Sequence, residues 1–405
     1  MDVLNTTASL NYTGDYNGTS TSLTTALWPD NDNATSDDLV AQLLSGDMPT
    51  STPEDVCTVL STNCECHSTY VFYTYEEKLI LGLISLPIIS FGLCANILSI
   101  CIFTHRVMRN SPINWYLAIL SCSDTVILLS AFFVLALPRL GEYIMAWEAT
   151  SFSYVIAPYF YGLMTMAQTV SVWMTVGMSL HRYTGVCFPF QSINILRRKR
   201  VIGFILGLIS FSIAFNTTRF MEVKVVNNCY RSNIGAMMPV LVPTDLRLDK
   251  MYRLIFFGWA YTIMMFVVPF SILIIVNTTV GFTIRRSNRM HTYQTSDASA
   301  KKAEAKERQT TIMLIAIVML FLSCNTLAFV VNILENINAA DELYNTLVCF
   351  NNLLVIVNAS SNIFIYMLFS DKYRILLQYY FCCRCCGEHR ALFNSSLDDV
   401  QTTAL

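Results

Sequence analysis

Two charged side chains lie in or at the end of otherwise uncharged apolar stretches, and their chemistry needs an explanation. Arg182, in the triplet His181-Arg182-Tyr183, follows a run from Tyr154 to Leu180 that contains no Asp, Glu, Lys or Arg. A guanidinium in hydrocarbon is costly unless it reaches the membrane edge or finds a partner. Because the run offers no acid, we expect Arg182 to face a cytoplasmic surface at which something else binds.

The second charge is Asp124, near the middle of the stretch Ile113–Leu137. A buried carboxylate must be protonated, hydrogen-bonded or paired with a cation. Polar residues of other stretches are candidates to surround it: Asn96, Ser171, Asn358 and Asn362. Asn358 and Asn362 are four residues apart and so share one helix face. Asp124, Ser171, Asn358 and Asn362 form a candidate sodium site; the alternative is a set of unrelated helix–helix hydrogen bonds.

Composition indicates what positions these residues. Of 405 residues 54% are hydrophobic and 13% charged, whereas soluble domains are nearer a quarter charged. Six stretches exceed the roughly 20 residues that a helix needs to cross a bilayer: Leu79–Phe103, Ile113–Leu137, Tyr154–Leu180, Leu254–Ile284, Thr310–Leu334 and Leu343–Phe369. Ile202–Phe215 is shorter, and Asn216 to Thr218 would extend it. The pattern predicts an all-α membrane protein, a bundle of seven transmembrane helices.

The distribution of charge predicts the orientation of this bundle. Residues 1–77 contain twelve acidic residues and no Lys or Arg, while Arg197-Arg198-Lys199-Arg200 and seven basic residues from Arg285 to Arg308 lie between later stretches. Basic loops stay on the cytoplasmic side, so the N-terminus is expected outside and the C-terminus inside. We expect an outer, largely disordered tail at 1–76, a seven-helix domain at 77–369 and an inner tail at 370–405. No cleavable signal peptide is expected, since the first twenty residues are polar.

Several residues outside the helices are candidates for modification. The outer tail has four glycosylation sequons, at Asn5, Asn11, Asn17 and Asn33. Cys57, Cys64, Cys66 and Cys229 are expected outside, where thiols oxidise. Cys382, Cys383, Cys385 and Cys386 follow the last stretch on the inner side. Their position favours palmitoylation over zinc, because no second pair of ligands is nearby. The C-terminal Thr403-Ala404-Leu405 fits a PDZ-binding end.

Five motifs in order make the chain resemble the rhodopsin-like (class A) G-protein-coupled receptors from about Glu77 to Phe381. They are Gly92-x-x-x-Asn96, Leu117-Ala118 with Asp124, Arg182-Tyr183, Pro269 and Asn362-x-x-x-Tyr366. A closer likeness is to the FMRFamide-type neuropeptide receptors of invertebrates, carried by Met166–Thr169, Arg219–Val223 and Asn362–Tyr366. That group is similar in lacking the proline of the seventh-helix motif, where this chain has Ile363.

The resemblance implies a cell-surface receptor that activates a heterotrimeric G protein through Arg182, Tyr183 and Tyr366, with arrestin as a further partner. It also implies an amphipathic eighth helix that starts at Ser370 to Arg374. The third-helix cysteine of the family would fall near Ala157, so Cys229 is expected to bridge Cys57, Cys64 or Cys66 instead.

Some residues depart from the family pattern. His181 stands where the family has an acid, which predicts raised basal signalling or a resting lock elsewhere. Thr326 and Ala328 stand where the sixth helix usually has Trp and Pro.

The resemblance also limits the classes of ligand that are expected. Met164 stands where amine receptors carry an acid, and no Lys lies between Asp341 and Lys372 for a retinal Schiff base. An amidated, FMRFamide-like peptide fits better, with its cationic Arg-Phe-amide end near outer acids: Glu142, Glu148, Glu222, Asp245, Asp249, Glu335, Asp341 and Glu342. The expected ligand-binding residues are Tyr161, Met164, Gln168, Asn325 and Asn332, of which the last three suit a C-terminal amide.

The alternative is a transporter or ion channel that uses Asp124 as an ion site. It predicts charges or broken helices in several spans and an internal repeat, and the sequence shows neither. No enzyme is expected, because the five histidines are scattered and no nucleophile–base pair stands out. Besides sodium we expect no cofactor, and the expected partners are a peptide, a G protein and the bilayer, not nucleic acid.

Overall fold

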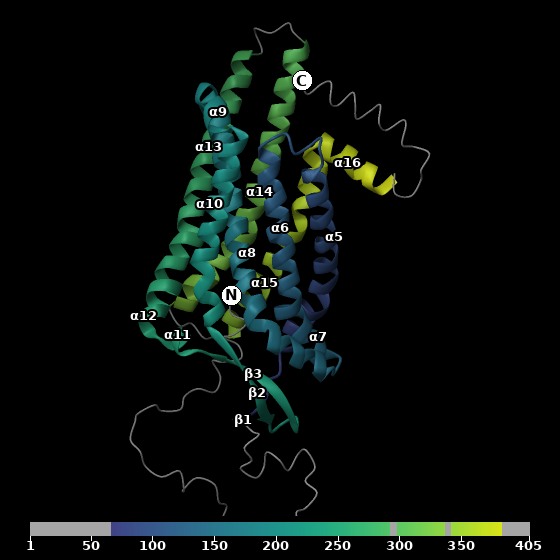
Figure 1. Ribbon diagram of the computed structural model, residues 1–405, viewed down its shortest axis with the longest axis vertical. Coiled ribbons are helices and arrows are strands. Elements are labelled where there is room, and N and C mark those ends of the chain that lie inside the picture. The colour runs from purple at the N-terminus through teal and green to yellow at the C-terminus, as the bar shows by residue number, and fades with distance from the viewer. Residues whose placement is uncertain (1–65, 292–297, 337–341, 383–405) are drawn as a thin grey trace, which may run out of the picture.

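A bundle of long helices forms the body of the computed structural model, which describes residues 66–291, 298–336 and 342–382 (Figure 1). The first segment comprises α4 (Tyr75–Glu77), η1 (Lys78–Ile84) and α5 (Ser85–Thr104). The second comprises α6 (Ile113–Ala131), η2 (Phe132–Ala136) and α7 (Leu137–Tyr143). The third is α8 (Trp147–Cys187), and the fourth is α10 (Arg198–Asn216) with η3 (Thr217–Met221). The fifth comprises α12 (Lys250–Tyr252), η4 (Arg253–Tyr261), η5 (Ile263–Val267) and α13 (Val268–His291). The sixth and seventh are α14 (Ala298–Asn336) and α15 (Glu342–Phe369), and α9 (Pro189–Ile195), α11 (Asp245–Leu248) and α16 (Asp371–Cys382) are shorter. The described residues thus confirm the predicted seven-helix bundle.

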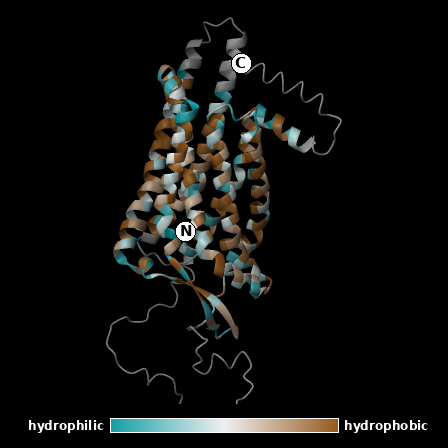
Figure 2. Ribbon diagram, in the orientation of Figure 1, coloured by the Kyte–Doolittle hydropathy of each residue, from teal (hydrophilic) through white to brown (hydrophobic). Residues whose placement is uncertain are grey.

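Six of the seven segments are long and apolar enough to cross a membrane, and the exception is α8. This 41-residue helix is the central one, and its buried residues include Thr165, Thr169 and Ser171. Threonine hydroxyls on it are satisfied locally, as Thr169 Oγ1 donates to the carbonyl of Thr165 at 2.9 Å. Neighbouring helices surround α8, so it needs less apolar surface than the other six segments, in which hydrophobic residues predominate (Figure 2).

Three of the described π-helical segments lie directly before a proline. The segments η1, η2 and η5 end two or three residues before Pro87, Pro138 and Pro269 respectively. A proline has no N–H for the carbonyl four residues earlier and its ring displaces that carbonyl, which widens the helix. These three prolines therefore open their helices locally.

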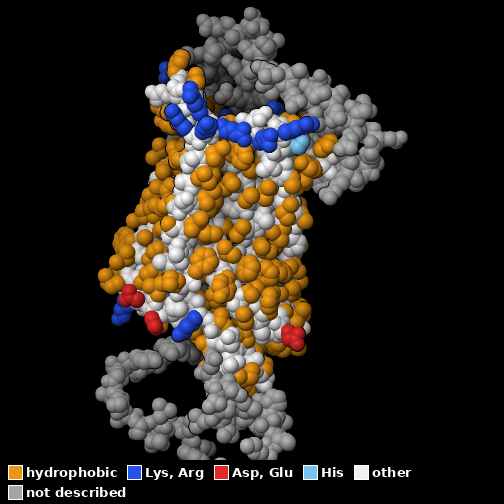
Figure 3. Space-filling model, in the orientation of Figure 1, with side chains coloured by type: hydrophobic (Ala, Val, Ile, Leu, Met, Phe, Trp, Pro, Cys, Tyr) orange, Lys and Arg blue, Asp and Glu red, His pale blue; other side chains and the backbone are white. Residues whose placement is uncertain are grey.

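The two ends of the bundle differ in charge, as predicted. Lys and Arg side chains gather at the end that carries α9 and α16, whereas the sheet lies at the other end (Figures 1 and 3). The α16 helix is anchored by Tyr373, which is fully buried and whose hydroxyl lies 2.7 Å from Ser99 Oγ. The tyrosine also packs between Phe103 and Tyr366, at ring-centroid distances of 5.5 and 5.4 Å. The α16 helix, which corresponds to the predicted amphipathic eighth helix, is thereby fixed to the inner end of the bundle.

The outer end carries a three-stranded sheet, which the all-α prediction lacked. Strand β2 (Val223–Arg231) pairs antiparallel with β3 (Ala236–Pro243) and parallel with β1 (Cys66–Ser68). The valine-rich run from Val223 to Val226 suits a strand, but β1 is only three residues long and is fixed by distant partners. Its register places Cys66 opposite Cys229. The described part of the predicted tail, from Cys66 to Glu76, is therefore folded onto the bundle and not disordered.

Candidate functional site

Asp124 lies at the centre of a buried polar cluster between three helices. It is 1% exposed, its Oδ2 accepts a hydrogen bond from Asn362 Nδ2 at 2.8 Å, and its Oδ1 accepts one from Ser171 Oγ at 3.3 Å. The structure therefore brings α6, α8 and α15 together at this carboxylate. Of the other two candidate neighbours, Asn96 donates to the carbonyls of Gly92 and Ala359 at 2.9 and 2.8 Å, and Asn358 lines an adjacent pocket.

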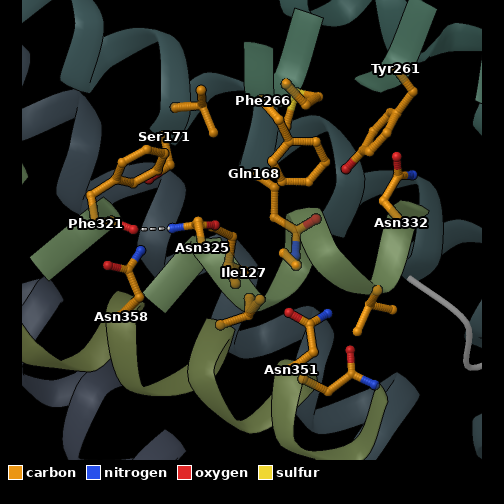
Figure 4. A pocket seen from close by; sticks show the side chains of 16 residues that line it. Ile127, Gln168, Ser171, Tyr261, Phe266, Phe321, Asn325, Asn332, Asn351 and Asn358 are labelled. Atoms are coloured by element: carbon orange, nitrogen blue, oxygen red, sulfur yellow. Dashed lines mark hydrogen bonds between the residues drawn. The ribbon is translucent and has the colours of Figure 1, made fainter. Parts of the chain in front are cut away.

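A pocket lies next to this cluster and shares Ser171 with it (Figure 4). Its wall combines aromatic side chains such as Tyr261 and Phe266 with a row of amides. The six amide residues are Gln168, Asn325, Asn332, Asn351, Asn352 and Asn358, and none of the sixteen lining residues is Asp, Glu, Lys or Arg. Such a wall can donate and accept hydrogen bonds, but it has no charged side chain that could neutralise an ionic group of a ligand.

Three of the five residues predicted to bind ligand line this pocket: Gln168, Asn325 and Asn332. The other two do not. Met164 is 2% exposed and packs in an apolar cluster with Ile127 and Ile356, while Tyr161 is 2% exposed and packs against Val223 of the sheet. Both side chains lie on α8 but contact neighbouring elements, so neither lines this pocket, and their role in ligand binding stays a prediction.

Asn351 and Asn352 are pocket residues that sequence reasoning missed. Each is 4% exposed, and Oδ1 of Asn351 is buried without a hydrogen-bond donor among the described residues. A buried carbonyl without a donor is costly, so this atom is suited to receive an N–H group from a ligand. The sequence does carry a signal for a polar site at this position, because two adjacent amide side chains stand within an otherwise apolar stretch.

The inner end of α8 carries the residues predicted to meet a G protein. Arg182 and Tyr183 are half-buried there, and the Tyr183 ring lies edge-on to Phe188, 5.6 Å away. His181 packs edge-on against Tyr116, 5.8 Å away, and neither of its ring nitrogens has a hydrogen-bond partner in the described chain. Tyr366 is fully buried beneath this end, edge-on to Phe103. His181 therefore does not replace an acid as a hydrogen-bonding partner of Arg182.

Two of the predicted outer acids are buried and already engaged. Glu222 is fully buried and accepts hydrogen bonds from Arg219 Nη1 at 3.3 Å, Arg247 Nη1 at 3.1 Å and the Tyr252 hydroxyl at 2.8 Å. The Arg219 guanidinium also lies 4.1 Å from the ring centroid of Phe257. Glu222 is thus a structural anion at the root of β2 and is not exposed to a ligand, contrary to the prediction.

Glu142, the second engaged acid, fixes the segment that precedes the first helix. It lies 2.7 Å from Lys78 Nζ and accepts from the Tyr70 hydroxyl at 2.8 Å and the Tyr73 amide at 3.1 Å. Burial raises the pKa of both tyrosines above the usual value, so they remain protonated donors. The first helix then begins with a capping box in which Thr74 and Glu77 hydrogen-bond each other's backbone.

A disulfide between Cys66 and Cys229 joins this segment to the outer loop. The implied bridge of Cys229 to one of three tail cysteines is therefore confirmed, with Cys66 as the partner. The join is reinforced by Asn233, whose amide accepts from the backbone N–H of Tyr70 at 2.8 Å and donates to its carbonyl at 2.7 Å. Arg231 Nη1 adds a bond to the carbonyl of Thr69 at 2.9 Å. We call residues Cys66–Thr74 the strap.

Several predicted sites lie outside the described residues. These are the sequons at Asn5, Asn11, Asn17 and Asn33, the outer acid Asp341, the cysteines Cys57, Cys64, Cys383, Cys385 and Cys386, and the C-terminal Thr403-Ala404-Leu405. Cys382 is the last residue of α16. Glycosylation, palmitoylation and PDZ binding stay predictions.

Comparison with known proteins identifies the family. Residues 95–366 match the family model of the 7 transmembrane receptor (rhodopsin family). The chain is 32% identical over 355 residues to the Probable G-protein coupled receptor frpr-1 of Caenorhabditis elegans, covering 82% of this chain and 88% of that one. It is 27% identical to the FMRFamide peptide receptor frpr-18 of the same organism, over 77% of this chain and 71% of that one.

A third relative is the FMRFamide receptor of Drosophila melanogaster, at 29% identity over 294 residues. The match covers 72% of this chain but 52% of that receptor, so the chain spans about half the length of this relative.

The family match runs from Ala95 in α5 to Tyr366 in α15 and so includes Asp124, the pocket and Arg182. It does not favour the alternative of a transporter or channel, and it indicates a receptor and not an enzyme. The chain therefore belongs to the rhodopsin family of seven transmembrane receptors, as a multi-pass protein of the plasma membrane.

Proposed function

We propose that this receptor binds an extracellular neuropeptide with an amidated C-terminus, of the FMRFamide type, and activates a heterotrimeric G protein. Two relatives carry FMRFamide in their names, and the receptor family couples to G proteins. The observation that carries the ligand class is the uncharged, amide-lined pocket with the unpaired Oδ1 of Asn351.

The chemistry of the pocket favours a carboxamide over a free carboxylate. A terminal –CONH₂ group donates two hydrogen bonds and accepts others, so it can satisfy Asn351 Oδ1 as well as the amides of Gln168 and Asn325. A carboxylate has no proton to donate, and it would bring a charge into a pocket whose lining has no cation. Burying a charge without a partner costs several kcal/mol. The amidated peptide is therefore expected to be the stronger agonist.

The test compares one peptide ending in Arg-Phe-amide with its free-acid form on the full-length receptor, with G-protein activation as the readout. The amide is expected to be more potent by at least about tenfold, the factor for one hydrogen bond to a buried group. Asn351→Leu should lower the potency of the amide and reduce the ratio between the two forms. Ser323→Ala is the matched control, since Ser323 is exposed on α14 and does not line the pocket. Equal potency of the two forms on the unmodified receptor would refute the proposal.

We also propose that Asp124 and Ser171 hold a sodium ion, with Asn358 and Asn362 completing a polar shell. Carboxylate, hydroxyl and amide oxygens are the ligands that hard cations take. Asp124 is buried and its carboxylate has two neutral hydrogen-bond donors and no ion pair among the described residues, so a cation suits its charge. Ser171 also lines the pocket, which links ion and peptide.

Signalling follows from a shift between two states of the bundle. A peptide that binds one state better raises its population, and the surface around Arg182 and Tyr183 then receives the G protein. Arrestin binding at the same end, and capture of the C-terminus by a PDZ protein, belong to this proposal.

A further inference from the structure

The junction between α7 and α8, at the outer end of the bundle, consists of five consecutive apolar residues, Tyr143-Ile144-Met145-Ala146-Trp147. We call this segment the outer corner. The side chains of Tyr143, Ile144 and Met145 are 53%, 61% and 78% exposed, although turns between helices are normally polar. A run of exposed apolar side chains marks a surface that a membrane or another protein covers.

The backbone of the outer corner is fixed, so that its side chains are held outward. The N–H of Met145 donates to the carbonyl of Glu142 at 3.2 Å, and that of Ala146 to the carbonyl of Gly141 at 2.7 Å. This pair of bonds ends a helix at a residue in the left-handed conformation, which is usually glycine. Here that residue is Met145, with a φ of 58°. Gly141 lets Thr150 of α8 pack directly against the end of α7, because a Cβ at this position would overlap the threonine hydroxyl.

The outer corner continues the lipid-facing surface of the bundle on both of its sides. The second membrane span, Ile113–Tyr143, ends at the first residue of the corner. Beyond the corner, Phe152, Val155 and Tyr159 are exposed and, at spacings of three and four residues, share one face of α8. The Phe152 ring lies 6.5 Å from the ring of Phe133 in the second span, edge-on. An exposed apolar strip therefore runs from the corner into the membrane-spanning part of the bundle.

The position and charge of the outer corner favour lipid as the phase that covers it. Figure 1 places α7 at the margin of the bundle, whereas the sheet extends beyond the bundle. The corner contains no charged residue; Glu142 before it is buried and paired with Lys78 at 2.7 Å, and Glu148 after it is exposed. Tyrosine and tryptophan, here Tyr143 and Trp147, are the residues typical of the boundary between membrane and water. Lipid of the outer leaflet is therefore the apolar phase nearest to the corner.

We propose that the outer corner is a membrane anchor, which inserts into phospholipid of the outer leaflet with Ile144 and Met145 at the boundary between headgroups and acyl chains. Apolar faces that lie in this boundary are buried about 5–10 Å deep. The anchor also bears on the strap, since the Trp147 ring lies edge-on to Tyr70 and Phe72, at centroid distances of 5.6 and 6.4 Å. The outer leaflet thus positions the first outer loop and, through Trp147, the strap.

The test places a fluorescent amino acid at position 144 of the full-length receptor, in phosphatidylcholine nanodiscs whose lipid carries bromine atoms at a chosen depth. Bromine quenches a fluorophore only at short range. We expect strong quenching by bromine in the upper part of the acyl chains and weaker quenching by bromine near the chain ends. The same probe at Met237, an exposed residue of β3, is the matched control and should not be quenched.

Two variants separate the anchor from the fold. Ile144→Ser with Met145→Ser removes the apolar side chains, so quenching of a probe at position 143 should fall to the level of the Met237 control, and amide hydrogen exchange of the strap should become faster. Met145→Gly keeps the turn, because glycine adopts a φ of 58° readily, and quenching of the same probe should fall less. Thermal unfolding of both variants verifies that the bundle is intact.

Four results would overturn the proposal. A probe at position 144 that is quenched no more than the control would place the corner in water. Absent quenching with energy transfer between differently labelled receptors in one nanodisc would identify a second copy as the cover. Quenching that appears only after proteolytic trimming of residues 1–65 would identify the tail as the cover. Unchanged exchange of the strap in the double serine variant would show that the anchor does not position it. All readouts are made without peptide, so they are independent of the proposed ligand.

Discussion

Replacing Glu222 by Gln removes the negative charge from a fully buried group of charged side chains at the outer end of the bundle. In the native receptor Glu222 accepts hydrogen bonds from Arg219 and Arg247, which are 0% and 8% exposed. Both guanidinium groups lie 3.1–3.3 Å from the Glu222 carboxylate in the native receptor. In the E222Q receptor they lose this anion. The change therefore leaves two like charges in a site that is closed to water.

The expected loss of stability follows from the burial. Removing one partner of a buried ion pair costs about 3–5 kcal/mol, because the other charge stays buried. Gln keeps a carbonyl that still accepts a hydrogen bond, so we expect the lower end, about 3 kcal/mol. With an unfolding entropy of about 2.1 cal/mol/K per residue over a domain of roughly 290 residues, the corresponding fall in Tm is about 5 °C.

The assay is thermal unfolding of the purified receptor in detergent, followed by tryptophan fluorescence. Glu148→Gln is the matched control, since Glu148 is an exposed outer acid with no described ion-pair partner. Its Tm should change little, as is usual for surface positions. The double variant E222Q with Arg247→Gln should recover part of the loss, because it removes one of the two cations that lose the Glu222 carboxylate. A Tm of E222Q within about 2 °C of the control would refute the reasoning, since the group would then have to be hydrated.

Three further predictions concern the strap and the signalling residues. Cys66→Ser frees the strap from Cys229, and we expect lower peptide potency with the helices still folded; unchanged potency and surface expression would mean that the hydrogen bonds suffice. His181→Glu supplies an anion beside Arg182 and should lower ligand-free G-protein activation, whereas an unchanged baseline would place the resting lock elsewhere. If sodium binds at Asp124, agonist affinity should differ between sodium chloride and choline chloride at equal ionic strength, and Asp124→Asn should abolish that difference. An equal salt effect in both receptors would argue against the sodium site.

The sequence predicted best those features that depend on local pattern. The apolar runs and the basic loops predicted the seven helices and their orientation, because a bilayer imposes both length and charge bias. The polar group around Asp124 was predicted from helix spacing, since Ser171 and Asn362 could be assigned to helix faces. Asn96 was misassigned, as its side chain bonds to a backbone carbonyl of a neighbouring helix, which no spacing rule reveals.

The features that the sequence did not predict depend on long-range pairing. Strand β1 is three residues long and exists because Cys66 meets Cys229, 163 residues away. The pocket lining depends on small rotations of whole helices, which bury Met164 and bring Asn351 to the wall. Glu222 looked like a loop acid, and only the fold places it between two arginines.

The strap has a consequence for cleavage of the receptor at the cell surface. A protease that cuts the backbone between Thr69 and Thr74 would sever the tail from the first helix, yet Cys66 would keep it attached to Cys229 of the outer loop. The nicked receptor would remain a two-chain molecule joined by the Cys66–Cys229 bond. After a cut between Thr69 and Thr74, release of the tail into the medium would therefore require a reductant as well as the protease.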